Sequence, residues 1–253
     1  IEGEISDGKH LMINNFDINE ENNNIKIKNL FLNDSYQFIK IDEANLNYLD
    51  NENKKNSFNV TKTSGDNYII NGESFNANSL ISSLLEGDNE KENNFFENNL
   101  NIDLNLAEVY IDKSHLIKNL KGNLEIKNNR LVGANILAFF NDKENISFSI
   151  STNDQDEKIT TLFSSKAKPL VDRFKFIKGF KDDQESFLDF YSTKKNGVST
   201  SKLIIDNFKV KEIPALAKLL ALASLQGIAD LLTGEGVRFT DLEMNFTNEN
   251  KLM

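Results

Sequence analysis

Hydrophobic and polar residues alternate along most of this chain. The clearest stretch is 100–112, in which leucine or isoleucine occupies every even position from 100 to 106 and Asn or Asp fills the positions between. Such alternation is typical of an antiparallel strand with one face buried and the other in water. The same pattern predicts strands over 23–34, 123–140, 146–152, 202–210 and 239–247.

Turn-forming clusters rich in Asn separate these runs, at 20–24, 50–56 and 126–130. Three of the resulting hairpins share a loose repeat, in which an apolar residue, a short strand, an Asn-rich turn and a second strand follow one another. The copies lie at 13–32, 117–136 and 238–253. Regular hairpins without alternating helices predict a mainly β fold, built as a long meandering antiparallel sheet.

Three segments depart from the strand pattern and predict short helices packed on or in the sheet. The first, 76–87, carries two apolar pairs one helical turn apart and ends at Gly87, a natural helix stop. The second lies near 165–178 and the third near 213–233.

An acidic, Asn-rich stretch at 89–99 marks the best candidate for a boundary in the chain. We therefore expect N-terminal hairpins with the first helix (1–88), a linker (89–99) and a C-terminal sheet with the other two helices (100–253). Because the chain begins with Ile and its last repeat stops within a hairpin, we expect it to be an excerpt of a longer protein.

The third helical segment is dominated by Ala and Leu, unlike the rest of the chain. Pro214 suits its first turn and Gly234 its end. The apolar run is shorter than the roughly 20 residues of a membrane span and includes Lys218 and Asp230, which disfavours that interpretation. Two interpretations stay open: a helix that fills the core of a sheet, or one that closes an apolar groove and touches lipid.

Composition excludes several kinds of chemistry. The net charge of −10, without a basic stripe, argues against binding to nucleic acid or to an anionic membrane surface. The absence of Cys excludes disulfides and thiol chemistry, and His10 and His115 do not have the spacing of metal ligands. No catalytic motif is present, so we expect neither an enzyme nor a metal or other cofactor.

Residues 204–247 resemble the C-terminal region of the AsmA-like family of diderm bacterial envelope proteins, in particular its YhdP-type branch. In that family an alternating strand leads into an Ala- and Leu-rich helix, a short glycine-containing continuation and further strands. The matching positions here are Ser224, Leu225, Gly227, Leu231, Leu232, Gly234, Gly236, Phe239 and Leu242. Weaker matches at 68–87, 102–136 and 160–180 extend the resemblance over about 60–247, with Asn76 standing where an acidic residue is usual.

The resemblance implies the periplasmic part of an inner-membrane-anchored envelope protein, with the anchor outside this excerpt. It implies a long curved antiparallel sheet, open as a groove (β-taco-like), that carries phospholipids between the inner and outer membranes. The family has no catalytic residues to transfer. An apolar sheet face agrees with this picture, because a soluble monomer rarely exposes such a surface.

The leading hypothesis is therefore a passive lipid-transfer groove, in which acyl chains slide along inward-facing side chains. The candidate groove residues are Ile102, Leu104, Leu106, Leu124, Ile126, Ile146, Phe148, Ile150, Leu203 and Ile205. The candidate groove-closing helix residues are Leu216, Leu219, Leu220, Leu225, Ile228, Leu231 and Leu232.

Two other hypotheses remain. In the first of them, the chain is a structural or assembly protein of the envelope, with a sealed core and with protein partners that pair with its open sheet edges. A weaker alternative is a segment of an extracellular β-rich adhesin, against which the Ala- and Leu-rich helix argues.

Overall fold

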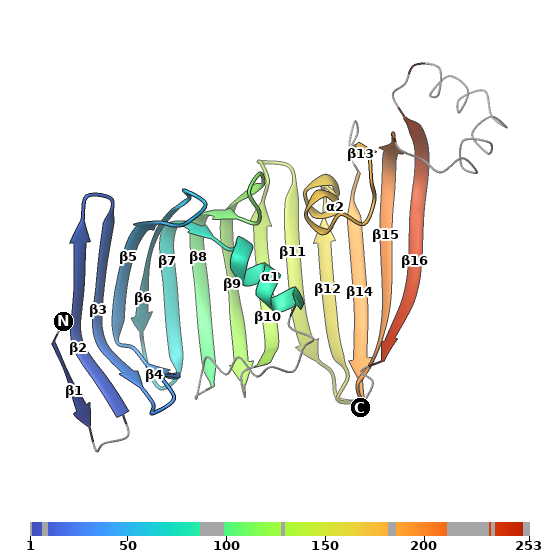
Figure 1. Cartoon of the computed structure of the whole chain (residues 1–253). Helices are drawn as coiled ribbons and strands as arrows, with labels where there is room; N and C mark the ends of the chain where they lie inside the picture. The colour runs from blue at the N-terminus through green and yellow to red at the C-terminus, as the bar shows by residue number, and fades with distance from the viewer. Residues whose placement is uncertain are drawn as a thin grey trace. The chain divides into compact units, whose positions relative to one another are not determined.

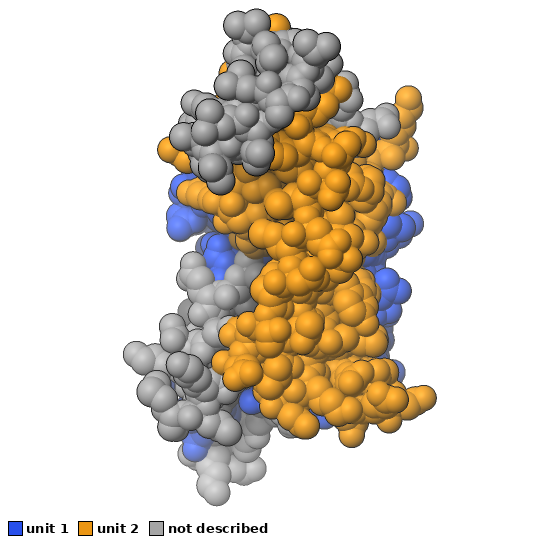
Figure 2. Space-filling model, turned by 90° about the vertical axis from the view of Figure 1, so that its right-hand side faces the viewer, with its two compact units in different colours: residues 1–141 blue, residues 142–253 orange. Residues whose placement is uncertain are grey.

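The computed structural model describes residues 2–6, 10–86, 99–127, 130–181, 186–211, 233 and 236–249. Within them lie sixteen strands and two helices, so the chain is mainly β, as the alternation predicts. It divides into two compact units, Ile1–Asn141 and Asp142–Met253. Figure 2 colours them blue and orange and looks onto the side of unit 2 that carries β16.

Unit 1 is an open sheet with the strand order β1-β2-β3-β5-β6-β7-β8-β9-β10, and β4 pairs with β3 (Figure 1). Its strands are β1 (Glu2–Ser6), β2 (His10–Glu20), β3 (Asn23–Leu32), β4 (Phe38–Lys40), β5 (Glu43–Leu49), β6 (Lys55–Lys62), β7 (Asn67–Asn76), β8 (Leu100–Tyr110), β9 (Leu116–Lys127) and β10 (Arg130–Phe139). Two of the predicted Asn-rich clusters, at 20–24 and 50–56, form the β2–β3 and β5–β6 turns.

The expectation of a purely antiparallel sheet is wrong at one place in unit 1. β7 and β8 run parallel, with Tyr68 opposite Ile102 and Ile70 opposite Leu104. Parallel neighbours need a crossover connection, and here it begins with α1 (Asn78–Glu86). This helix confirms the one predicted at 76–87, and Figure 1 shows it crossing β9 and β10.

The parallel pairing of β7 with β8 is relevant to the domain boundary expected at 89–99. The strands on either side of segment 89–99 are hydrogen-bonded neighbours in one sheet. The compact units divide between Asn141 and Asp142. Residues 89–98 of the expected linker lie outside the described residues, so the division expected from the sequence stays a prediction.

Unit 2 is a smaller antiparallel sheet with the order β11-β12-β14-β15, in which β16 and β13 also pair with β15. Its elements are β11 (Asn145–Thr152), β12 (Lys158–Ser164), α2 (Lys168–Phe174), β13 (Phe180–Lys181), β14 (Leu188–Lys195), β15 (Val198–Val210) and β16 (Val237–Glu249).

Helix α2 covers one end of the unit 2 sheet. Pro169 occupies its first turn, and Lys175 ends it in the left-handed region (φ 53°), with its N–H donating to the Val171 carbonyl. The helix is therefore shorter than predicted for 165–178. Its Leu170 and Val171 form a closed core with strand residues that include Leu188 and Ile205. Of the third predicted helix, 213–233, all residues but Thr233 lie outside the described residues.

Three strands contain an asparagine in the left-handed region, a conformation that Asn tolerates better than most residues. These asparagine kinks are Asn29 (φ 51°), Asn119 (φ 53°) and Asn207 (φ 50°). Each occupies the third position of an Ile–polar–Asn–apolar sequence, at 27–30, 117–120 and 205–208. This short motif therefore recurs along the chain, but its positions do not coincide with the copies of the loose repeat.

At each kink the inward-facing side chains switch between odd-numbered and even-numbered positions of the strand. In β15, Leu203 and Ile205 are buried before the kink, and Phe208 and Val210 after it. The neighbouring strand makes the same change, because Asp206 pairs with Asp241 and Phe208 with Phe239, so that one residue is skipped on each side. Because the register does not shift across the kink, the apolar residues of both strands stay on one continuous face.

We expect Asn207→Val to destabilise the chain by about 1–2 kcal/mol, because a β-branched residue is strained in the left-handed region. Asn207→Gly should be close to neutral. Thr200→Val, on the exposed face of the same strand, is the matched control. Urea unfolding of the three variants tests this, and an Asn207→Val variant as stable as the Thr200→Val control would contradict the role of the kink.

Candidate functional site

The inner face of unit 1, defined as the face that carries its apolar residues, holds continuous rows of side chains. Each row consists of residues placed directly opposite one another on successive strands. The first row runs Phe16, Ile27, Ala44, Val60, Ile70, Leu104, Gly122 and Ile136. It crosses eight strands, about 34 Å at a strand spacing of about 4.8 Å.

A second row lies beside the first. It runs Ile18, Ile25, Leu46, Phe58, Gly72, Leu106 and Leu120. Most side chains in both rows are only half-buried; in the first row Ala44 alone is buried. Hydrophobic side chains in a closed core are normally almost fully excluded from water, so the described part of the chain covers this face incompletely.

One end of the inner face of unit 1 is closed. Ile41, Ala44, Tyr68 and Leu100 form a small buried cluster there. Phe38 packs against it, with its ring centroid 6.2 Å from that of Tyr68. The half-buried part of the rows in unit 1 therefore lies beyond this cluster.

The five groove candidates of unit 1 all lie on this inner face. Ile102 is directly opposite Leu124, and Leu106 is directly opposite Leu120. Leu106 is buried, whereas Ile102, Leu104, Leu124 and Ile126 are half-buried. The structure thus brings these residues together, and their contact with lipid stays a prediction.

The five candidates of unit 2 fall into two groups. Leu203 and Ile205 belong to the closed core that α2 covers, and Ile205 is completely inaccessible to solvent. Their side chains are already covered by protein, which leaves no room for an acyl chain. Ile146, Phe148 and Ile150 lie on the same face of β11, and of these Ile150 is buried. The seven candidate residues of the groove-closing helix lie outside the described residues.

Sequence reasoning missed the contribution of β3, β5, β6 and β7 to the apolar rows. Ile27, Val60 and Ile70 stand in the same row as Leu104. The signal was present for Ile27 and Val60, which alternate with polar neighbours, but was blurred at Ile70, which follows Ile69. What the sequence could not supply was the register that places them in line.

A glycine interrupts each of the two rows where the strands approach closely. A Cβ added at Gly122 would overlap the carbonyl oxygen of Asn135 and lie 2.8 Å from the Cα of Ile136. At Gly72 an added Cβ would lie 2.6 Å from the carbonyl oxygen of Ser57. Both neighbours are backbone and cannot move aside cheaply, so glycine is required at these points of the sheet.

A polar cluster of Asp50, Glu52, Asn56, Asn76 and Asn78 fastens the start of α1 to the β5–β6 turn. Asn76 Nδ2 donates to Asp50 Oδ2 (2.7 Å) and to Glu52 Oε2 (3.0 Å). Asn78 Nδ2 donates to Glu52 Oε1 (3.0 Å). The buried Asn56 accepts a bond from the backbone N–H of Asn76 (2.8 Å). These bonds hold the crossover helix in place.

The two carboxylates of this cluster are stabilised in their charged form. Desolvation works to raise the pKa of Asp50, but hydrogen bonds from the Lys54 N–H, Asn76, Asn56 and the Glu52 N–H outweigh it and keep that pKa below its ordinary value. Bonds from Asn76 and Asn78 lower the pKa of Glu52. Because the oxygens of both carboxylates accept hydrogen bonds from the cluster and its turn, we assign the cluster a structural role.

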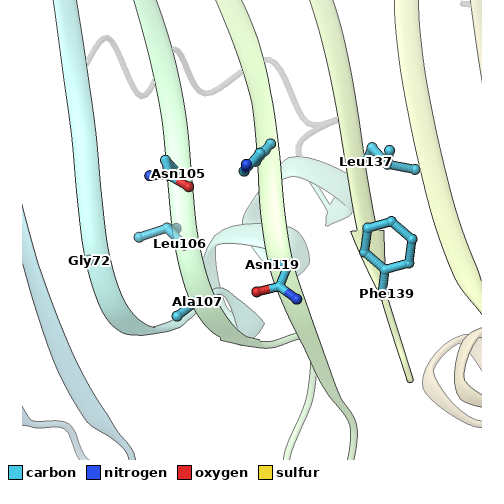
Figure 3. Close-up of a pocket in the computed structure, with 8 residues that line it drawn as sticks. Gly72, Asn105, Leu106, Ala107, Asn119, Leu137 and Phe139 are labelled. Atoms are coloured by element: carbon cyan, nitrogen blue, oxygen red, sulfur yellow. The ribbon is translucent and has the colours of Figure 1, made fainter. Parts of the chain in front are cut away.

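A hollow of about 410 Å³ lies over β7 to β10 of unit 1 (Figure 3). Asn105, Lys121 and Leu137 line it and stand directly opposite one another on the face that alternates with the apolar rows. Asn105 also donates to Asn71 Oδ1 (3.3 Å). These three residues belong to the outer, mainly polar face, although Gly72 and Leu106 of the second apolar row also line the hollow.

Among the described residues, no group of three or more His, Asp or Glu side chains is placed to hold a metal ion. In the same part of the chain, no helix has the length and apolar character needed to cross a membrane.

Comparisons of the chain with protein-family models, with curated proteins and with solved structures give no significant match. The resemblance to the AsmA-like family accordingly remains an expectation from the sequence.

We expect Gly122→Ala to destabilise the chain by roughly 1–3 kcal/mol, since the new methyl group meets backbone atoms. Gly133→Ala is the matched control, because a Cβ there meets only atoms of the Glu125 side chain, the nearest at 3.0 Å. Thermal unfolding of both variants tests the close approach. Equal stability of the two would contradict it.

The lowered pKa values of Asp50 and Glu52 give stability a defined pH dependence. Their contribution is complete above about pH 4, near the ordinary pKa, and is lost as the pH falls through the lower values of the folded state. Asp50→Asn should lower the unfolding midpoint at neutral pH and flatten its decline towards pH 3. Asp66→Asn, in an exposed turn, is the control. An Asp50→Asn variant with the unchanged pH profile would show that the cluster contributes nothing.

Proposed function

We propose that this chain is a segment of a periplasmic lipid-transfer groove that passes phospholipids between the inner and outer membranes of a diderm envelope. The observation that carries the proposal is the pair of apolar rows of unit 1, which cross successive strands and remain half-buried. A face of this kind needs a cover, and acyl chains are a cover that can also move. The sequence resemblance of residues 204–247 to the AsmA-like family supports the same function.

The mechanism is passive and needs no catalytic group. Acyl chains lie against residues such as Ile70 and Leu104, and headgroups stay in water at the open side of the sheet. Each buried methylene contributes about 0.8 kcal/mol, so hydrophobic contact alone is enough to hold a lipid. Because the rows present similar side chains on successive strands, a chain that moves along them exchanges one apolar contact for another.

In this proposal the chain is not an enzyme and uses no cofactor. Its partners are phospholipid acyl chains, together with envelope proteins that pair with open strand edges. It belongs to a protein held by an inner-membrane anchor outside residues 1–253. The groove-closing helix of the sequence hypothesis, near 213–233, belongs to the proposal as a cover for lipid.

A second candidate function is a structural or assembly protein of the envelope without lipid cargo. The specific observation that favours it is the core beneath α2, where Val171 and Ile205 are completely inaccessible to solvent. Unit 2 shows that this chain can seal an apolar sheet face with its own helix. A protein sealed in this way throughout would bind partners only through its edges.

Photo-crosslinking distinguishes the two functions. A photoreactive amino acid at Leu104, on the inner face, should yield lipid adducts when the chain is produced in a bacterial envelope. The same group at Asp103, the exposed neighbour on the outer face, should not. Mass spectrometry of the purified protein measures both. The absence of lipid adducts at both positions would exclude the lipid-transfer function and favour the structural one.

A further inference from the structure

Strand β16 forms an edge of the unit 2 sheet (Figure 1). One side of the strand pairs with β15 from Val237 to Glu249. Among the described residues, no strand pairs with its other side. An edge of this kind presents a row of N–H and C=O groups that can bind another strand.

The edge of β16 has little of the protection that edge strands normally carry. Its register with β15 is regular from Asp241 to Glu249, without a bulge. Within 237–249 there is neither proline nor lysine. Proline, lysine, bulges and short length are the usual means that keep an edge from pairing, so the straight stretch 241–249 is open to a further strand.

The two faces of this stretch determine which strand can pair with it. On the inner face Leu242 and Met244 are half-buried, and Phe246 is 46% exposed even though its ring centroid lies 6.5 Å from that of Phe190. The alternate positions on the outer face carry exposed polar or acidic side chains. A suitable partner therefore brings apolar side chains to the inner face and no further negative charge to the outer face.

A second copy of β16 meets the inner-face condition in an antiparallel register centred on Met244. In this register Met244 lies directly opposite its own copy, and Leu242 lies opposite Phe246 of the second copy. Side chains directly opposite each other on antiparallel strands are in contact. The pairing therefore covers the exposed ring of Phe246 twice, once on each side of the axis.

The same register also meets the outer-face condition. Glu243 lies opposite Asn245 of the second copy, and Asp241 lies opposite Thr247. Within one strand Asn245 Nδ2 already donates to Glu243 Oε1 (2.9 Å), so an amide beside this carboxylate is a favourable neighbour. No two acidic side chains of the stretch are directly opposite each other in this register.

Charge disfavours the neighbouring registers of the same pair. A pair centred on 242 or 243 sets Glu243 against Asp241 or against its own copy. A pair centred on 245 or 246 sets Glu249 against Asp241 or against Glu243. Like charges in directly opposite positions destabilise a sheet, so the acidic residues of β16 select the register centred on Met244.

We propose that the chain forms a two-fold symmetric dimer in which β16 pairs antiparallel with β16 of a second copy, with Met244 on the axis. The symmetric contact uses the same edge of both copies, so it closes without further growth there. A junction of one strand with one strand is smaller than the roughly 1,200 Å² of a standard interface, and the dimer therefore dissociates on dilution. The proposal goes beyond the lipid function and does not depend on it.

Cysteine cross-linking of the full chain tests the register, and the absence of native cysteine makes each product unambiguous. Met244→Cys alone should form a disulfide-linked dimer under mild oxidation, because directly opposite Cβ atoms lie about 4.5–5.5 Å apart. Leu242→Cys alone and Phe246→Cys alone should not, because each residue is four positions, roughly 13 Å, from its copy. An equimolar mixture of these two variants should cross-link. A cross-link of Leu242→Cys with itself, or none with Met244→Cys and none in the mixture, would overturn the proposal.

A pair of charge variants tests the same contact by sedimentation equilibrium without lipid. Thr247→Asp, which faces Asp241 of the second copy, should weaken the dimer by about fivefold, and Thr247→Lys should strengthen it by about fivefold. Thr200 is the matched control position, because it lies directly opposite Thr247 on β15, is exposed on the same outer face and does not reach the second copy. Thr200→Asp and Thr200→Lys should leave the dimer unchanged. Equal effects at the two positions would contradict the β16 contact.

The remaining outcomes separate this proposal from the lipid function. A chain that stays monomeric at all concentrations overturns the dimer, whether another protein or the rest of this chain covers the edge. Masses that grow beyond a dimer would show head-to-tail pairing with another edge, and would overturn it as well. Lipid adducts at Leu104 are measured separately: if they form on a monomeric chain, the dimer is wrong and the lipid function stands.

Discussion

The apolar face of a thin sheet must be covered, and most of the structure follows from how each unit meets that requirement. Strict alternation places every second side chain of the strands on one face, so that face accumulates Leu, Ile, Val and Phe. In unit 2 a short helix covers one end, and residues such as Ile205 become inaccessible to solvent. In unit 1 the rows that include Ile70 and Leu104 are only half-buried. The difference between a closed core and a half-covered face within one chain is the physical basis of the proposed function.

The asparagine kinks and the two row glycines keep this face continuous while the sheet bends. A regular strand that twists strongly would rotate its apolar residues away from the common face. At Asn207 the parity of β15 and of its neighbour changes together, so the residues on both sides of the kink still point inward. At Gly122 the backbones approach so closely that no side chain fits. The long apolar surface therefore depends on residues that tolerate an unusual backbone conformation, such as Asn207, or a close backbone approach, such as Gly122.

Much of the fold could be predicted from sequence periodicity. The strands around 100–112 and 202–210 and the first two helices are present, because alternation and helix stops are local properties. The parallel pairing of β7 with β8 was not predicted, since it depends on where the chain returns after α1 and leaves no local signal. The candidate site could be predicted only as a set of inward residues. Which of them are covered depends on the position of α2 over Leu203 and Ile205, a long-range packing property that no periodicity contains.

The central claim is that the apolar rows of unit 1 are covered by lipid and not by protein. An experimental structure of the chain purified from bacterial membranes without added lipid tests it most directly. The expected result is elongated density for acyl chains against the half-buried row residues, including Ile70 and Leu104. Contact of the same residues with side chains of this chain alone, in a dry and filled interior, would contradict the account.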